Sequence, residues 1–541
     1  MPFPILRASL LAGLCAPLAS ATGDWANSGG NDQRNGLALE VGPAAAQLLW
    51  SSAPSSIIAW LPVIDGRRVY SVRQTGFPPA GEPNGSPIVC QDLDTGAVLW
   101  SVNVPHASGD WTTWIAGVSN GRLYASRSGN GASVQSFLHA YDAATGAWLW
   151  TSTEKTDMGA YDGAVFAPDG DPVLASFTRI KRFDAQTGAL VWSANRLCSV
   201  SGNCGGALAA SGDALYVTDA VVGGHAIRKH SLATGALLYT GPAMSGFTLQ
   251  NTPFVGPDGT IYLSRTQNNA ATDFFYAFTD TGSGLVEKWK VPAQWTTNAE
   301  CAVGPDGSVY MIGPGRVVQR LDPDNGTVLA SSAALGAGTI APRIATDPLG
   351  NVYVSNGAFS EGRLFAFNAN LQTQWQVAVP NINIGGPSIG IDGTLVVAGI
   401  GTNVRAYRTA RALRADRLAL SSSAGGSVNF SIDTGPANAG KLHLLVGSLS
   451  GTQPGTPAGA LVLPLNYDAY TALTLSAPNS AFLPGSLGSL DPQGKGASAL
   501  SLPGGLTPPY GLTAHHAVVV IDAANLSVTL VSNPIGLRFD A

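Results

Sequence analysis

Tyr141-Asp142-Ala143-Ala144-Thr145-Gly146, followed by a short apolar run that ends at Trp150, is the stretch that decides the fold. The phrase returns in Phe183-Asp184-Ala185-Gln186-Thr187-Gly188, which ends at Trp192, and in a shorter form in Leu93-Asp94-Thr95-Gly96, which ends at Trp100. An Asp side chain accepts hydrogen bonds from the backbone that follows it, and Gly takes the left-handed conformation of a tight turn. The phrase therefore predicts a hairpin. Weaker copies occupy residues 231–239 and 321–329, and more degenerate ones end at 289 and 375.

A second recurring phrase precedes the first by about twenty residues. It reads Asn120-Gly121-Arg122-Leu123-Tyr124 in one copy and Asp258-Gly259-Thr260-Ile261-Tyr262 in another, with further copies at residues 306–310 and 350–353. Each copy predicts another hairpin, because a Gly turn leads into a β-prone apolar run. Two hairpins in each period make a four-stranded sheet, which is the blade of a β-propeller.

The outermost strand of the repeat recurs at a nearly constant interval of about 46 residues, close to known blade periods. Its eight positions are Trp50, Trp100, Trp150, Trp192, Tyr239, Trp289, Leu329 and Trp375. The strand at residues 48–50 has no blade before it, and the inner strands at 388–407 have no outer strand after them. We therefore predict an all-β, eight-bladed propeller in which the N-terminal strand closes the last blade and removes the exposed edges. Seven blades, or two stacked sandwiches, are the alternatives.

The Asp-x-x-Thr-Gly-x-x-Leu-Trp phrase resembles the docking repeat of the quinoprotein-like (PQQ-repeat) β-propeller superfamily. The opening run from Asp24 to Gly36 is similar to the segment that precedes such propellers. The resemblance covers roughly residues 24 to 410. It implies the fold and says little about chemistry, because the repeated residues dock neighbouring blades and touch no substrate.

This superfamily includes pyrroloquinoline-quinone (PQQ) alcohol and sugar dehydrogenases and also non-catalytic scaffolds such as the Bam-machine lipoprotein. The alcohol dehydrogenases use a vicinal Cys-Cys pair, which this sequence lacks. They also hold calcium with channel-facing Glu, Asn and Asp oxygens, ligands that calcium prefers. The resemblance suggests channel candidates: Asp162, Asn251, Asn298, Glu300 and Arg343, with Trp111 and Trp114 as stacking rings. The alternative is a wet channel in which Glu300 and Arg343 are simply solvated.

The N-terminus has the pattern of an export signal. Arg7 precedes an apolar stretch at residues 8–18 and an Ala19-Ser20-Ala21 cleavage site. We expect an extracytoplasmic protein, periplasmic or secreted, without a transmembrane segment. In an oxidising compartment Cys198 and Cys204 would close a disulfide loop. Cys90 and Cys301 lie on predicted strands and are expected to be buried apolar residues.

The repeat stops at Tyr407, and alternating strands separated by Gly/Pro/Ser loops follow. We predict three parts: a signal peptide at 1–21, the propeller at 22–409 and a C-terminal β-sandwich-like module at 410–541. In that module His515 and His516 are adjacent on one strand and point to opposite faces, so they do not share a metal easily. Residues 322–326 hint at a calcium loop but occupy the position of a repeat turn.

Only 12% of the residues are charged and the formal net charge is −5, without a basic run, which argues against nucleic acid as a partner. No catalytic motif is present, so the favoured function is a binding or scaffold propeller for a protein or glycan partner, without a cofactor or metal. A PQQ- and calcium-dependent dehydrogenase is the first alternative. A hydrolase or lyase that uses channel-mouth carboxylates such as Asp162 and Glu300 is the second.

Overall fold

The computed structural model describes most of the chain. The described ranges are 24–52, 60–73, 86–105, 110–129, 137–157, 162–198, 205–244, 252–265, 273–294, 301–390, 393–400, 404–409, 411–421, 424–459, 461–505 and 512–540. The predicted signal peptide lies outside them. Among these residues, no helix is both long and apolar enough to cross a membrane.

The described residues of the repeat region form eight four-stranded antiparallel sheets, numbered here in chain order. Sheets 1 to 3 contain β2 (Val63–Asp65), β3 (Arg68–Val72), β4 (Ile88–Asp92) and β5 (Val98–Val102); β6 (Asp110–Ser119), β7 (Arg122–Gly129), β8 (Phe137–Asp142) and β9 (Trp148–Lys155); and β10 (Val165–Phe166), β11 (Pro172–Ala175), β12 (Arg179–Phe183) and β13 (Leu190–Asn195). Sheets 4 and 5 contain β14 (Gly206–Leu208), β15 (Ala214–Val221), β16 (Gly224–Ser231) and β17 (Leu237–Thr240); and β18 (Phe254–Val255), β19 (Ile261–Arg265), β20 (Phe274–Asp280) and β21 (Leu285–Pro292). Sheets 6 and 7 contain β22 (Ala302–Val303), β23 (Val309–Gly313), β24 (Val317–Leu321) and β25 (Val328–Ala334); and β26 (Arg343–Thr346), β27 (Val352–Ser355), β28 (Arg363–Phe367) and β29 (Thr373–Ala378).

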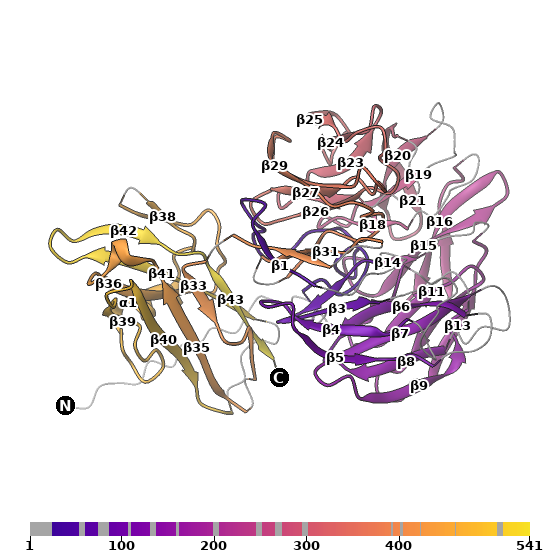
Figure 1. Ribbon diagram of the computed structural model, residues 1–541. Helices are drawn as coiled ribbons and strands as arrows, with labels where there is room; N and C mark the ends of the chain where they lie inside the picture. Colours follow the sequence, from indigo (N-terminus) through magenta and orange to yellow (C-terminus); the bar gives the residue numbers. More distant parts are fainter. Residues whose placement is uncertain are drawn as a thin grey trace, which may run out of the picture.

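Sheet 8 joins the two ends of the repeat region. It contains β30 (Ser388–Ile389), β31 (Leu395–Val397), β32 (Arg405–Tyr407) and, as its fourth strand, β1 (Leu48–Ser51). Trp50 lies opposite Ala406, and Ser51 lies opposite Arg405. The predicted pairing of the N-terminal strand with the last inner strands is therefore confirmed. Figure 1 shows the sheets arranged around a centre.

The Asp-x-x-Thr-Gly turns are built as the sequence predicts. In sheet 2, Asp142 Oδ1 accepts hydrogen bonds from the Thr145 amide and hydroxyl, both at 2.8 Å. In sheet 1 the equivalent residue is Asp92, not Asp94, because Asp92 Oδ1 accepts the bonds of Thr95. The shorter sequence phrase was therefore read two residues too late. These turns and the turns between the first and second strands lie at one end of each sheet, here called the repeat-turn side.

Each repeat turn is also the place where neighbouring sheets dock. The Trp150 indole donates to the Ala185 carbonyl at 3.0 Å, and a Cβ added at Gly188 would lie 2.5 Å from its ring. A side chain there would displace the indole, so Gly188 is required both for this approach and for its φ of +73°. Equivalent pairs are Trp50 with Gly96, Trp100 with Gly146, Trp192 with Gly235 and Trp289 with Gly326.

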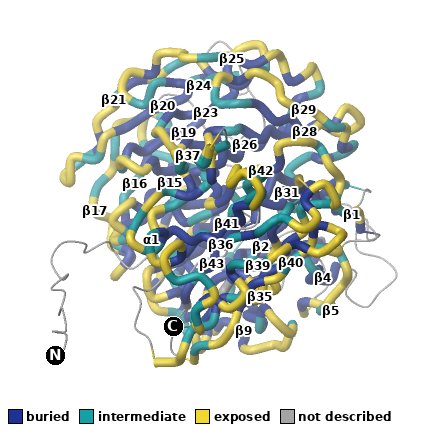
Figure 2. The backbone as a smooth tube through the Cα atoms, turned by 90° about the vertical axis from the view of Figure 1, so that its left-hand side faces the viewer, coloured by how far each residue is buried: buried dark blue, intermediate teal, exposed yellow. Residues whose placement is uncertain are grey.

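Burial follows the order of the strands within each sheet. The first three strands carry most of the buried residues, whereas the outer strands expose apolar side chains such as Val98 and Leu238. In Figure 2 the outer strands β5, β9, β17, β21 and β25 lie around the periphery, where exposed segments are frequent. The core is thus a set of clusters between adjacent sheets.

Cys90 lies on β4, as predicted, whereas Cys301 lies one residue before β22. Cys90 and Cys301 are free and buried, and burial raises the pKa of each thiol to about 12. Cys198 is disulfide-bonded. Cys204, its predicted partner, lies outside the described residues, so the pairing stays a prediction.

The C-terminal residues form a second arrangement of sheets. A three-stranded sheet contains β33 (Leu413–Ala415), β35 (Gly426–Asp433) and β40 (Lys495–Leu502). A larger sheet contains β34 (Ala419–Ser421), β36 (Leu442–Ser448), β39 (Leu487–Ser489), β41 (Thr513–Asp522), β42 (Ser527–Val531) and β43 (Ile535–Asp540). The remaining elements are η2 (Pro436–Asn438), β37 (Thr456–Ala458), β38 (Leu461–Leu463) and α1 (Ala469–Ser476). Phe430 of the first sheet and Val518 of the second share one buried cluster, so the two sheets pack together as a sandwich.

The two adjacent histidines of β41 have separate surroundings, as the sequence predicts. His516 is fully buried, where its Nε2 lies 2.8 Å from the Tyr470 hydroxyl and its ring lies against Phe430. His515 Nε2 lies 3.2 Å from Glu40 Oε1 of the propeller. Further contacts between the two parts are Arg67 to the Ala415 carbonyl at 2.6 Å and Arg538 to Asp24 at 3.7 Å.

His516 makes the stability of the C-terminal part depend on pH. Burial, and then the neighbouring His515, lower the pKa of His516 from 6.5 to about 3. The unfolded chain therefore binds the proton first as the pH falls. The contribution of neutral His516 to the free energy of unfolding is fully present above about pH 6.5. Below that pH the free energy of unfolding falls by about 1.4 kcal/mol per pH unit.

We expect His516→Gln to reduce the loss of stability between pH 7 and pH 5 by about 2 kcal/mol, because Gln does not take up a proton. Urea unfolding followed by circular dichroism at both pH values measures the difference. An unchanged pH dependence in the variant would assign the effect to other groups.

Candidate functional site

Three of the residues predicted to line the channel do lie together at the centre of the ring. Asp162, Arg343 and Trp114 border one space with Ser28 and Trp60. Trp114 and Arg343 are only 1% and 2% exposed, so Arg343 is not the solvated residue of the wet-channel alternative. The volume of this space is about 20 Å³, enough for about one water molecule.

The centre is narrow because the chain's own N-terminal segment runs through it. Residues 24–38, here called the N-terminal collar, touch the innermost strands of successive sheets in order. The collar bonds are Trp25 with Ile64 (sheet 1), Ala26 with Val118 (sheet 2), Asp32 with Phe166 (sheet 3) and Leu208 (sheet 4), Gln33 with Val255 (sheet 5), Asn35 with Val303 (sheet 6), and Gly36 and Ala38 with Thr346 (sheet 7). Each is 2.7–3.1 Å long. The collar is therefore a built part of the ring.

Arg34 fixes the collar at the centre. Its guanidinium donates to four backbone carbonyls, at Ser28, Asp162, Gly163 and Gly206, over 2.5–2.8 Å. Burial lowers the pKa of Arg34, while the carboxylates of Asp162 and Asp32 act in the opposite direction. A planar cation with five donors satisfies several carbonyls that converge from different elements.

The predicted ligand Asp162 is engaged in the same structural network. Its Oδ2 accepts the Gly205 amide at 3.1 Å and the Thr252 hydroxyl. Arg343 donates to the Ser28 hydroxyl at 3.2 Å. Burial lowers the pKa of Arg343 to about 10, with Asp162 opposing the shift and Arg34 adding to it. The described part of the channel thus holds two buried cations.

The other four predicted channel residues lie wholly or partly outside the part of the chain that the structure describes. Asn251, Asn298 and Glu300 lie outside the described residues. Trp111 belongs to β6, and its side chain is not described.

The residues described at the centre do not fit a bound quinone. Small-molecule sites usually offer at least ~300 Å³, far more than the space bordered by Asp162 and Arg343. Asp162 Oδ2 is already used by two donors, and Arg34 occupies the neighbouring carbonyls. Among the described residues no group of three His, Cys, Asp or Glu side chains is placed to hold a metal ion.

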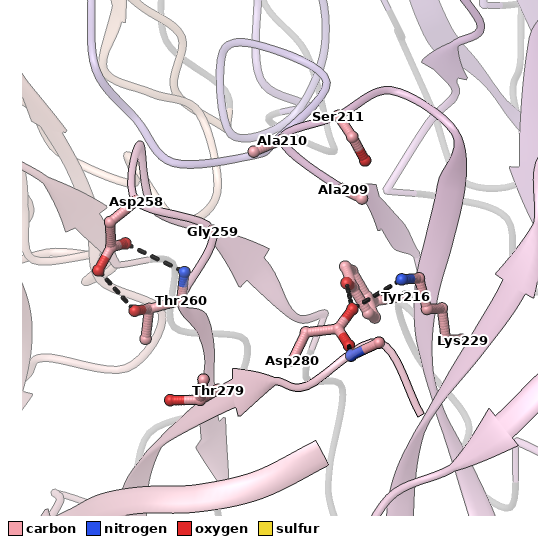
Figure 3. A pocket seen from close by; sticks show the side chains of 11 residues that line it. Ala209, Ala210, Ser211, Tyr216, Lys229, Asp258, Gly259, Thr260, Thr279 and Asp280 are labelled. Carbon is pink, nitrogen blue, oxygen red and sulfur yellow. Dashed lines mark hydrogen bonds and ion pairs between the residues drawn. The ribbon is translucent and has the colours of Figure 1, made fainter. Parts of the chain in front are cut away.

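A larger pocket opens on the repeat-turn side between sheets 4 and 5 (Figure 3). Its volume is about 310 Å³. It is lined by the 209–211 turn, Tyr216 and Lys229 of sheet 4, and by the 258–260 turn, Thr279, Asp280 and Gly282 of sheet 5. Its lining is rich in hydroxyl groups and charged side chains.

Asp280 is the centre of the polar network in this pocket, as Figure 3 shows. Its Oδ2 accepts the Lys229 ammonium at 2.7 Å and the Tyr216 hydroxyl, and its Oδ1 accepts the Gly282 amide at 2.7 Å. Burial raises the pKa of Asp280, but hydrogen bonds led by that from Lys229 outweigh burial and hold the pKa well below its usual value. Asp280 is therefore ionised at neutral pH.

Sequence reasoning missed both the collar and this pocket. The collar has no strand alternation, and its signal is a run of Gly, Asn and Asp directly before the first blade. The pocket's signal is a set of departures from the repeat in sheets 4 and 5, where Tyr239 replaces the docking Trp.

Three comparisons place this architecture among known proteins. A family model described as outer membrane protein assembly factor BamB matches residues 84–294, which run from β4 to β21. The europium-containing methanol dehydrogenase has a TM-score of 0.50 and 13% identity, with 70% of this chain and 90% of that chain covered. The quinohemoprotein alcohol dehydrogenase from Comamonas testosteroni has a TM-score of 0.50 and 14% identity, with 73% of this chain and 82% of that chain covered. The chain is thus similar to quinoprotein-like β-propellers in its fold and, over residues 84–294, in its sequence pattern.

The family model and the two dehydrogenase structures belong to proteins of different kinds. The BamB structure from Moraxella catarrhalis also aligns, with a TM-score of 0.45, 16% identity, and 63% of this chain and all of that chain covered. No curated protein matches the sequence significantly. At these identities the likeness describes the fold, so function has to be argued from the site.

Proposed function

We propose that the protein is an extracytoplasmic binding or scaffold propeller that holds a protein or glycan partner on its repeat-turn side. The observation that carries the proposal is the filling of the described part of the centre, where the N-terminal collar leaves about 20 Å³ beside Asp162 and Arg343. The larger pocket, of about 310 Å³, lies instead among the turns at the surface. A rigid ring with loops at its surface is suited to presenting a binding face.

Two further features support this proposal. The C-terminal sandwich contacts the propeller on the same side, through Arg67 beside the β2–β3 turn and through Asp65, which lies 3.8 Å from Arg538. The pocket and the sandwich therefore face a partner from one side of the ring. The export pattern at residues 1–21 and the disulfide at Cys198 support an oxidising, extracytoplasmic compartment.

Photocrosslinking from two exposed positions tests the proposal. A photoreactive residue at Ser283 lies on the repeat-turn side, and one at Val222 lies in the β15–β16 turn at the opposite end of sheet 4. We expect cells that express the full chain to give one discrete adduct from Ser283 and none from Val222. Equal labelling from both positions, or none from either, would contradict a partner-binding repeat-turn side.

Reconstitution tests the dehydrogenase alternative. We expect the purified chain, incubated with PQQ and Ca²⁺ and then gel-filtered, to keep no quinone absorbance and to reduce no dye with alcohols. One quinone retained per chain would overturn the proposal.

A further inference from the structure

The pocket between sheets 4 and 5 occupies a position that an arginine fills elsewhere in the ring. In sheet 6, Arg320 donates to Asp306 and, at 3.0 Å, to the Ser308 hydroxyl of its own sheet. It also donates to the Ala369 carbonyl in the repeat turn of sheet 7, at 3.2 Å. One guanidinium thus closes the groove between two sheets.

Sheet 3 contains the same arrangement. Arg182 pairs with Asp169 and Asp171 of its own sheet and donates to the Leu232 carbonyl of sheet 4 at 3.0 Å. Arg182 and Arg320 both stand two residues before the first residue of their repeat turn. Asp169 and Asp306 both precede the Gly of the turn between the first two strands.

Sheet 4 departs from this arrangement at both positions. Lys229 stands where sheets 3 and 6 have Arg, and Ser211 stands where those two sheets have Asp. The shorter Lys229 donates to Asp280 of sheet 5, and the Ser211 hydroxyl turns to Asp213. Both changes remove side-chain volume from the groove.

Sheet 5 adds a third departure. Its repeat turn is two residues longer than that of sheet 3, since Phe278 pairs with Glu287 whereas Phe183 pairs with Leu190. A Cβ added at Gly282 would meet no atom within 4 Å, whereas Gly188 is covered by a Trp. Three departures at one boundary therefore open the pocket of about 310 Å³.

The groups that line the pocket restrict the class of ligand. Lys229 contributes one positive charge, and Asp258 and Asp280 contribute two negative charges, which disfavours a simple anion. Lys229 is already paired with Asp280, and Lys288 Nζ lies 4.0 Å from Asp258 Oδ2, so neither lining carboxylate is uncompensated. Two paired carboxylates also fall far short of the six to eight oxygen ligands that calcium takes. A neutral ligand with several hydroxyls fits both the ammonium and the carboxylates, because each hydroxyl can accept a hydrogen bond from Lys229 and donate one to an Asp.

The available lone pairs and protons agree with that class. The Asp258 carboxylate, about half exposed, accepts the Thr260 amide at 3.0 Å and hydroxyl at 2.7 Å, which leaves acceptor capacity on both oxygens. Lys229 has three N–H donors and uses one on Asp280. The hydroxyls of Thr260 and Thr279 also line the pocket.

We propose that this pocket binds one sugar residue of a glycan, with Asp258 and Asp280 accepting from its hydroxyls and Lys229 donating to them. This inference deepens the proposed binding function and rests on it. A volume of about 310 Å³ is at the lower end of small-molecule sites, which suits a single ring.

The decisive variant reproduces in sheet 4 the arrangement of sheets 3 and 6. Ser211→Asp combined with Lys229→Arg fills the groove with the pair seen at Asp306 and Arg320. The matched control, Asp306→Ser with Arg320→Lys, makes the reverse change in sheet 6. Saturation-transfer NMR and calorimetry of the full chain use glucose, galactose, mannose and N-acetylglucosamine as probes.

We expect at least one of these sugars to bind the wild type and the control equally, and to bind the filled variant at least tenfold more weakly. Asp258→Asn, a conservative change at a half-exposed residue, is expected to weaken the binding of the same sugar several-fold. This variant tests the inference if the filled variant does not fold. Absence of binding by every probe, or binding unaffected by both changes, would overturn the inference.

N-acetylarginine amide, as a further probe, separates a sugar from a cationic peptide. If this compound bound to the pocket and the sugars did not, the assignment of a sugar as the ligand would be overturned. The proposed function has its own readout: a discrete adduct from Ser283 without sugar binding refutes the inference alone, whereas absence of both refutes the two together.

Discussion

Replacing Trp150 by alanine is expected to lower the free energy of unfolding of the propeller by about 3–5 kcal/mol, the usual cost of removing a buried Trp side chain. Trp150 is 6% exposed, packs on the Tyr124 ring at 5.8 Å and covers Gly188. Its indole N–H donates to the Ala185 carbonyl of the next sheet. The variant removes packing and leaves that carbonyl without the indole donor at a boundary between two sheets.

Trp148, two residues earlier in the same strand, is the matched control. It is 60% exposed, and its indole donates only to Thr151 within its own strand, at 3.2 Å. We expect Trp148→Ala to change the stability by no more than about 0.5 kcal/mol. Urea unfolding followed by circular dichroism measures both variants. Equal losses in the two would show that the docking contact does not stabilise the ring.

The repeat made the sheets predictable because its residues act locally. Asp142, Thr145 and Gly146 form their turn with their own backbone, so their spacing alone predicts it. The pairing of residues 48–51 with the last inner strands was predictable as well, since a closed ring leaves no orphan strand. The wrong assignment of Asp94 shows where prediction from spacing ends. Two acidic residues share that turn, and only the structure shows that Asp92 accepts the hydrogen bonds of the turn.

The centre of the ring was not predictable, because its order comes from contacts across the sequence. Arg34 donates to the carbonyls of Asp162 and Gly206, which lie 128 and 172 residues away in the sequence. Asp162 and Arg343 were candidates because the sequence puts them near the ends of inner strands, yet their surroundings depend on Arg34, which carries no motif. The pocket was missed for a related reason: it arises where Lys229 and Ser211 depart from the repeat, and a search for repeats records such departures as noise.

Replacing Arg34 by methionine is expected to lower the free energy of unfolding by about 3–5 kcal/mol, as for the loss of one partner from a buried polar network. Four carbonyls of the collar and of sheets 3 and 4 would lose a donor each, and each buried group without a partner costs about 1–3 kcal/mol unless water reaches it. The stability of Arg34→Lys is expected to lie between that of the wild type and that of Arg34→Met, because an ammonium cannot reach all four carbonyls. Arg363→Met, at an exposed position on β28, is the control and is expected to change stability by no more than about 0.5 kcal/mol. Urea unfolding measures the three variants. If Arg34→Met were as stable as Arg363→Met, the collar would not be a stabilising part of the ring, and the filled centre that carries the proposed function would lose its support.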